Sequence, residues 1–173
     1  MNPSSSRPQP VPGFEQLYDY RARLLDRFEQ QPAEFAAVLA GIPEPEWRTR
    51  QDERGRTLHM IAAHVRFLET LAFMPRIRAV LNEENPNLVA YPTHHFADER
   101  YDPDEPMAAI LEEWSHARAE IVQWLRPLDA AGWTRLGFHA PSGERTLQWW
   151  VERTYAHARE HLDEIRGAHL PAL

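Results

Sequence analysis

The chain of 173 residues is 43% hydrophobic and 10% aromatic, which is enough for one domain with a packed core. Its formal net charge is −7, with 26 acidic against 19 basic residues, so we expect no nucleic-acid partner. The sequence contains neither Cys nor Lys, which excludes disulfides, Cys-ligated metals and Schiff-base chemistry on a lysine of this chain.

The first residues of the chain differ in composition from the rest. Residues 1–13 are rich in Pro and Ser and lack the apolar core of a secretory signal, so we expect a disordered lead-in. Residues 14–173 are then expected to form a single helical domain. The apolar runs are too short to span a bilayer, and together these features predict a cytoplasmic protein without a membrane partner.

A first helix is predicted where apolar residues recur at helical spacing from Phe14 onward. We expect this helix to reach about Ala40 and to break near Pro32. Residues 41–56 contain several Pro and Gly and predict a long connection. Thr57 is the predicted N-cap of the helix that follows.

The second helix is expected to run to about Leu81, with a kink just before Pro75. Its apolar face carries His64 at a position where an aliphatic residue is expected. Residues 82–105 show no sustained period and contain three prolines, so we expect a long crossing connection. A connection of that length allows the second and third helices to be non-neighbours.

The third helix is predicted to begin at Pro106 and to carry an unbroken apolar stripe as far as Leu128. Residues 129–145 predict a loop with one helical turn near its start. The fourth helix is predicted over 146–166, with Gly167 ending it. Without alternating strand patterns or internal repeats, the expected fold class is all-α, an antiparallel-type four-helix bundle with long inter-helix connections.

Three histidines occupy apolar helix faces: His64 on the second helix, and His157 and His161 on the fourth. Positions four residues apart project from adjacent turns, so His157 and His161 can hold one ion between them. A buried imidazole needs a partner for its ring nitrogens, and one shared divalent metal would satisfy all three rings. Without Cys, that metal must be bound by His, Asp or Glu, and zinc, nickel or iron would suit imidazole ligands.

A structural interpretation of these histidines remains open at this stage, since each ring could be a core residue with an ordinary hydrogen-bond partner. Trp150 and Arg153 precede His157 by two turns and one turn, so we consider them pocket residues, although a core role for Trp150 and a surface ion pair for Arg153 fit equally. Glu164 is a candidate fourth ligand or an outer acceptor for an imidazole N–H.

The remaining histidines carry weaker signals. His59 and His116 are expected to be exposed. His94 and His95 lie in the long connection, where they could cover a pocket or simply be polar loop residues. His139 carries no specific signal.

The stretch from His157 to His161 also reads H-x-x-E-H, the inverted zinc-peptidase pattern, in which Glu160 would be the general base. Such enzymes take a further ligand well downstream, and only twelve residues follow His161. His64 on another helix is the better third ligand.

The arrangement of these motifs resembles the DinB/YfiT-like superfamily over residues 14–168. The resemblance is carried by Thr57-Leu58, His64 and Glu69 in the second helix, and by Gly143 to Thr146-Leu147 leading into His157-Ala-Arg-Glu-His161-Leu-Asp-Glu-Ile165 in the fourth. It implies a four-helix bundle, often a homodimer, with a divalent metal held by three histidines. Transferred to this sequence, the metal ligands are His64, His157 and His161.

The resemblance also implies a choice of activities. Relatives of this kind include thiol-dependent S-transferases, a mycothiol-dependent maleylpyruvate isomerase and proteins described as metal-dependent hydrolases. We therefore expect a metal-activated water or thiol acting on a small-molecule substrate, the thiol being a low-molecular-weight cofactor because the chain has no Cys. The alternative is a non-catalytic, stress-associated binding or dimerisation module with a structural metal or none.

Overall fold

The computed structural model describes residues 12–91 and 100–169, without the side chains of residues 168 and 169, so most of the predicted lead-in lies outside it. The described elements, in chain order, are α1 (Glu15–Ala40), the 3-10 helix η1 (Glu44–Arg48), α2 (Leu58–Leu68), the π-helix η2 (Glu69–Phe73), α3 (Met74–Asn82), β1 (Asn87–Leu88), α5 (Met107–Leu125), α6 (Ala130–Trp133), β2 (Leu136–His139), β3 (Gly143–Thr146) and α7 (Leu147–His169). None of the described helices is long and apolar enough to cross a membrane.

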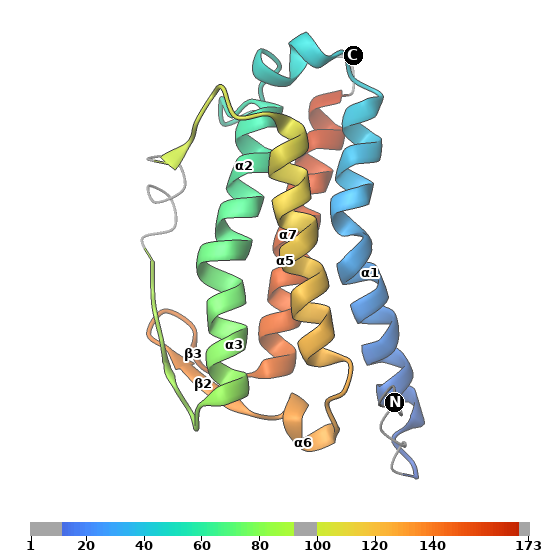
Figure 1. Cartoon of the computed structure of the whole chain (residues 1–173), viewed down its shortest axis with the longest axis vertical. Helices are drawn as coiled ribbons and strands as arrows, with labels where there is room; N and C mark the ends of the chain where they lie inside the picture. The colour runs from blue at the N-terminus through green and yellow to red at the C-terminus, as the bar shows by residue number, and fades with distance from the viewer. Residues whose placement is uncertain (1–11, 92–99, 170–173) are drawn as a thin grey trace, which may run out of the picture.

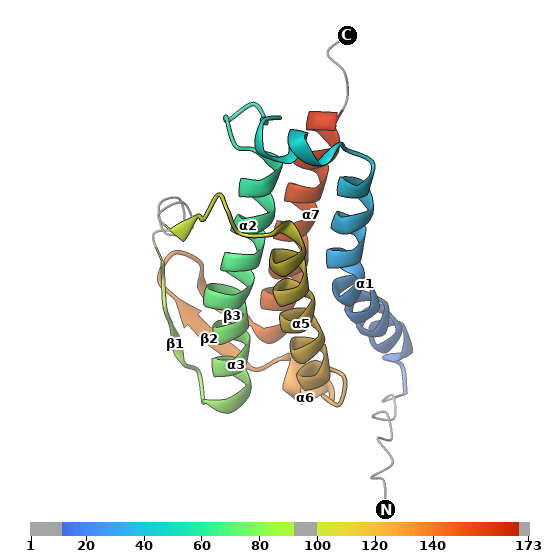
Figure 2. The ribbon, with the colours of Figure 1, turned by 45° about the horizontal axis from the view of Figure 1, so that its top comes forward.

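Four rods form the bundle: α1, α2 continued by α3, α5, and α7 (Figure 1). α1 packs against α5 and α7, and α2 packs against the same two helices. Figures 1 and 2 show that α1 and α7 run in one direction while α2 and α5 run in the other. The order is therefore up, down, down, up, and the expected antiparallel arrangement holds for only part of the bundle. The connection after α3 has to return along the full length of the bundle before α5 begins.

A small mixed sheet corrects the all-α prediction (Figure 2). β1 pairs in parallel with β2 at Asn87 and Phe138, and β2 pairs antiparallel with β3 in a hairpin that leads directly into α7. The predicted helical turn near the start of the 129–145 loop is confirmed as α6. Strands of two to four residues are too short for an alternating pattern to separate them from loop sequence.

The predicted break at Pro32 is wrong, because α1 continues through this buried residue. Proline has no N–H to donate to the carbonyl four residues earlier, which leaves the Phe28 carbonyl free. Arg118 Nη1 donates to that carbonyl oxygen at 3.2 Å, so the hydrogen bond lost from the helix is replaced from α5. Gly167 likewise does not end α7, which continues to His169.

The second predicted helix is distorted where expected. Thr57 is confirmed as its N-cap, with the side chain accepting from the Met60 N–H. The π-helix η2 ends immediately before α3, whose first turn contains Pro75. A π turn accommodates one more residue than an α turn, so η2 rotates the side chains of α3 relative to those of α2.

A buried ion pair lies at the centre of the bundle, between Arg118 of α5 and Glu69 of η2. Arg118 Nη2 donates to Glu69 Oε2 at 2.9 Å, and the two side chains are 0% and 1% exposed. Arg118 Nη1 donates to Gln31 Oε1 at 2.7 Å, and the guanidinium stacks on the Phe28 ring. Burial raises the pKa of the Glu69 carboxyl, and the guanidinium charge acts against that rise. The pair thus ties α5 to the distorted turn between α2 and α3.

Loss of one partner from this pair should be much worse than loss of both. In Arg118→Met the Glu69 carboxylate stays buried without a cation, and we expect the free energy of unfolding to fall by about 3–5 kcal/mol. The double variant Arg118→Met/Glu69→Leu should recover a large part of that loss. Urea denaturation of the wild type, the single variants Arg118→Met and Glu69→Leu, and the double variant measures both effects. Arg126→Met, in an exposed pair with Asp26, should change stability by less than about 1 kcal/mol, and additive losses in the double variant would refute the coupling.

Candidate metal centre

The inward face of α7 meets α2 along an apolar seam in which histidines replace aliphatic residues. The inward face of α7, on which the two predicted histidines lie, is buried at Leu147, Trp150, Val151, Thr154, His157, Ala158, His161 and Ile165. On α2, His64 lies between the buried residues Ile61 and Leu68 and is itself half-buried. Because α2 and α7 are neighbours, the structure brings these histidines together.

The three imidazole rings are packed against one another. The centroid of the His157 ring is 4.6 Å from that of His161, and the His64 ring is 5.4 Å from His157 and 4.9 Å from His161. One nitrogen from each ring can be chosen so that all three lie within 4.8 Å of one another. Within the described residues, this is the group of side chains with the arrangement of a metal site.

The nitrogen positions suit a divalent ion. His157 Nε2 and His161 Nε2 are 3.2 Å apart. Two nitrogens bonded to one tetrahedral zinc at about 2.0–2.1 Å are separated by about 3.3–3.4 Å, so these two need almost no movement. A hydrogen bond between the two rings has the same length. That hydrogen bond would involve only two of the three imidazoles, whereas a shared ion would also use a nitrogen of His64.

Glu164 orients one of the rings. His161 Nδ1 donates to Glu164 Oε2 at 2.5 Å, and Arg56 Nη2 donates to the same carboxylate oxygen at 2.7 Å. Asp52 in turn holds Arg56 through an ion pair of 2.9 Å. Because the Glu164 carboxylate can only accept a hydrogen bond, Nδ1 of the neutral His161 ring carries the proton. The lone pair is then on Nε2, which faces His157. Glu164 therefore stands as an outer acceptor of an imidazole N–H.

Burial keeps the histidines of α7 uncharged. Desolvation holds the pKa of His157 well below 6.5, and the neighbouring His161 and His64 rings add to this effect. Desolvation also lowers the pKa of His161, although the Glu164 carboxylate acts in the opposite direction. Both rings are therefore neutral at pH 7, which is the state in which an imidazole nitrogen binds metal.

The histidines open onto a cavity of about 450 Å³. Both predicted pocket residues, Trp150 and Arg153, line it together with Glu164. Arg153 also makes the surface ion pair foreseen for it, at 3.2 Å to Glu160. The other lining residues are Arg54, Arg56, Leu68, Phe73, Arg76, His139, Ser142, Trp149 and Glu160.

Other histidines fall in different places. His59 is fully buried, so the prediction of an exposed residue is wrong: its ring nitrogens contact the Tyr101 hydroxyl at 2.9 Å and the Glu105 carbonyl at 2.8 Å. His116 is exposed, as predicted. His94 and His95 lie outside the described residues.

Arg76 and His139 are among the lining residues that sequence reasoning missed. Arg76 follows the π-helix, which shifts it off the face expected from an unbroken helical period. His139 lies on β2, a strand that the sequence did not reveal. The position of Pro75, one residue before Arg76, is the signal that could have indicated a change of face.

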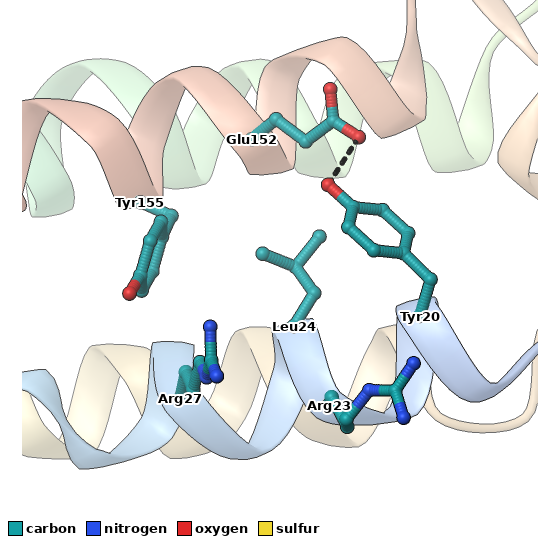
Figure 3. A pocket seen from close by; sticks show the side chains of 6 residues that line it. All are labelled: Tyr20, Arg23, Leu24, Arg27, Glu152 and Tyr155. Atoms are coloured by element: carbon teal, nitrogen blue, oxygen red, sulfur yellow. Dashed lines mark hydrogen bonds between the residues drawn. The ribbon is translucent and has the colours of Figure 1, made fainter. Parts of the chain in front are cut away.

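A second hollow, of about 350 Å³, lies between α1 and α7 (Figure 3). Tyr20 donates to Glu152 across it at 2.9 Å, and Arg23 and Arg27 line its α1 side. Burial and the Glu152 carboxylate raise the pKa of Tyr20 to about 12, so the phenol stays protonated. Its lining contains no histidine, and the three-histidine group lines the larger cavity instead.

Comparisons with known proteins show the family and the fold. The family model of the DinB superfamily matches residues 27–165. Among solved structures, the chain resembles YfiT from Bacillus subtilis, described as a probable metal-dependent hydrolase with an unusual four-helix bundle topology. The two share 16% sequence identity, and the match covers 94% of this chain and 91% of YfiT with a TM-score of 0.79. A comparison with curated proteins found no significant match.

The metal-free protein should lose stability as the pH falls below about 6.5. Because the folded-state pKa values of His157 and His161 are lowered, the unfolded chain binds more protons below its own pKa of about 6.5. As the pH falls, each of these histidines lowers the free energy of unfolding by up to about 1.4 kcal/mol per pH unit until its folded-state pKa is reached. Above pH 6.5 the neutral histidines cause no such loss of stability.

Urea denaturation of chelator-treated protein between pH 5 and 7.5 measures the slope. His157→Gln should flatten it, whereas the exposed control His116→Gln should keep the wild-type slope. Equal slopes in the wild type and His157→Gln would contradict the assignment of this pH dependence to the buried ring.

Proposed function

The chain belongs to the DinB superfamily, and we propose that it is a divalent-metal-dependent enzyme whose ion is held by His64, His157 and His161. The observation that carries the proposal is the convergence of three imidazoles at the wall of a 450 Å³ cavity. Zinc is the ion we favour, and nickel and iron also suit such ligands. A cavity of this size suits a small-molecule substrate.

When bound, a divalent ion supplies Lewis acidity, which activates a water or a thiol and polarises a carbonyl oxygen. The side chains of this protein perform the remaining tasks. Burial keeps the α7 imidazoles neutral, and Glu164 fixes the orientation of the His161 ring. Trp150 and Phe73 supply apolar walls that limit access of water to the histidines.

Two reaction classes remain within this proposal: hydrolysis, and transfer of a low-molecular-weight thiol. The chain itself offers no thiol, so the second class needs a thiol cofactor in the cavity. The alternative of a non-catalytic module with a structural metal would call for a closed set of four protein ligands. Three nitrogens beside a cavity support an enzyme instead, because three protein ligands leave a position free.

The purified wild-type protein should contain close to one divalent ion per chain, and loss of a ligand should remove it. We expect His64→Ala and His161→Ala to retain much less metal by elemental analysis, since two imidazoles bind an ion far more weakly than three. His116→Ala, an exposed histidine of α5, should retain the wild-type content. Occupancy should also fall as the pH drops below about 6, because protonated imidazoles do not bind metal.

Turnover is tested on the same proteins. Loaded wild-type protein is assayed for hydrolysis of ester and amide panels, and for consumption of glutathione, bacillithiol or mycothiol in the presence of electrophiles. Activity that follows metal content across the variants supports the enzyme and selects its class. Full occupancy without turnover in either assay would favour the non-catalytic module, and wild-type metal content in His64→Ala would refute the three-histidine site.

Glu164→Gln should weaken zinc binding by about 10–100-fold without abolishing it, because the amide cannot support the His161 imidazole as a carboxylate does. Competition with a zinc chelator measures the affinity. The matched control is Asp163→Asn, which removes an exposed carboxylate one residue away that pairs with Arg159 and Arg166. If both variants bind zinc as the wild type does, the proposed outer role of Glu164 is wrong.

A further inference from the structure

Arg76 is a buried cation that forms no ion pair with a carboxylate of the described residues. Its side chain lines the histidine cavity and the residue is 6% exposed. Nε and Nη2 both donate to one oxygen, the Val89 carbonyl, at 3.1 and 2.8 Å. Within the described part of the chain, no carboxylate forms an ion pair with it. Burial lowers the pKa of the guanidinium, which reflects the free-energy cost of placing an unpaired charge there.

Two further polar groups of the same cavity are buried without a partner. Trp150 is 1% exposed, and its Nε1 has no hydrogen-bond partner among the described residues. His139 is 7% exposed, with Nδ1 3.0 Å from the Ser142 hydroxyl and Nε2 without a partner in the same part of the chain. The His139 ring packs edge-on against Trp150 at 5.3 Å, and the Arg76 guanidinium lies 5.3 Å from the Trp150 ring.

These three side chains share one chemical property. Arg and Trp side chains only donate hydrogen bonds, and His139 can donate from Nε2 when the Ser142 hydroxyl donates to Nδ1. Burial of unsatisfied donors costs free energy, which an acceptor brought by a ligand would recover. The cluster of Arg76, Trp150 and His139, called the donor cluster below, is therefore suited to an oxyanion.

The other arginines around the cavity already have carboxylate partners. Arg56 pairs with Asp52 and Glu164, and Arg153 pairs with Glu160. Arg54, largely exposed, lies 3.7 Å from Glu164. One guanidinium without a carboxylate partner matches the single negative charge of a carboxylate, whereas the dianion of a phosphate monoester would bring an excess charge into a buried place.

The π-helix explains how Arg76 comes to line the cavity with His64. Arg76 follows His64 by twelve positions, and at about 100° per residue an unbroken α-helix would place the two side chains about 120° apart around its axis. One residue accommodated by the π turn reduces the effective separation to eleven, or about 20°. The distorted turn thus places His64, a candidate metal ligand, and Arg76 on one face of the rod formed by α2 and α3.

We propose that the donor cluster binds the carboxylate group of a small molecule, with Arg76 as its anchor. Resting on the proposed function, this assigns carboxylic acids as the substrate class, with the remainder of the substrate lying toward the histidines. The guanidinium gains an anion that residues 12–91 and 100–167 do not provide, and the Trp150 and His139 N–H groups supply further hydrogen bonds.

The test compares Arg76→Met with the matched control Arg78→Met, which removes an exposed arginine from the same helix. Hexanoate and 4-phenylbutanoate are titrated by calorimetry into metal-loaded and chelator-treated protein, with the corresponding amides and inorganic phosphate as further arms. Both carboxylates should bind the wild type and Arg78→Met and raise their melting temperatures. Arg76→Met should bind the two carboxylates at least about tenfold more weakly than the wild type does. The wild type should bind the corresponding amides at least about tenfold more weakly than the carboxylates.

The melting temperature of the free protein separates ligand binding from a structural role. Met fills a similar volume without a charge, so Arg76→Met should melt at or above the wild-type temperature. A clear fall in melting temperature with unchanged carboxylate affinity would make Arg76 structural and overturn the proposal. Should Arg76→Met fail to fold, Trp150→Phe, which removes the N–H donor and keeps an aromatic ring, should still weaken carboxylate binding.

Failure of this inference and failure of the metal proposal are distinguishable. Arg76→Met should bind zinc as the wild type does. Carboxylate binding that depends on Arg76 in chelator-treated protein would support the inference even if no metal bound. Equal carboxylate binding in the wild type and Arg76→Met, no binding of either acid, or binding of phosphate in their place would each overturn it.

Discussion

The packing of three imidazoles against one another between α2 and α7, two of them buried and His64 half-buried, is the constraint on which the rest of the site depends. Each ring occupies a place that an aliphatic side chain would fill at no cost in desolvation, so the fold gains nothing from histidine there unless the ring nitrogens are used. Burial keeps the α7 rings neutral, and Glu164 directs the lone pair of His161 inward. The same packing that lowers their pKa values also prepares them as ligands.

The π-helix links the chemistry of the site to the core of the bundle. Its first residue, Glu69, is held by Arg118 of α5, and its last, Phe73, packs against the His157 ring at 5.3 Å. An inserted residue in a helix has to be stabilised by tertiary contacts, because it disturbs the regular hydrogen-bond ladder. The buried ion pair provides such a contact. The core therefore maintains the distortion that brings Arg76 to the cavity.

Helical periodicity was sufficient to predict the four rods, the inward face of α7 and the convergence of its two histidines with His64. It failed where tertiary contacts replaced local ones. Pro32 does not break α1 because Arg118 takes over the freed carbonyl, and His59 is buried because Tyr101 and Glu105 satisfy both of its nitrogens. Arg76 and His139 were not predicted, since one follows a π turn and the other lies on a strand too short to recognise.

Two of the buried arginines, Arg118 and Arg76, show how one residue type serves structure and binding. Arg118 has a carboxylate, an amide oxygen and a carbonyl within hydrogen-bond distance, so its charge is compensated inside the fold. Arg76 has a single carbonyl oxygen and aromatic neighbours, and lies at a cavity. A charge that the described residues leave without a carboxylate partner at a cavity wall lowers stability in the free state and raises affinity for an anion. The two parts of one cavity thus have different roles. The neutral histidines suit a metal ion, and the Arg76 cation suits the charged group of a substrate.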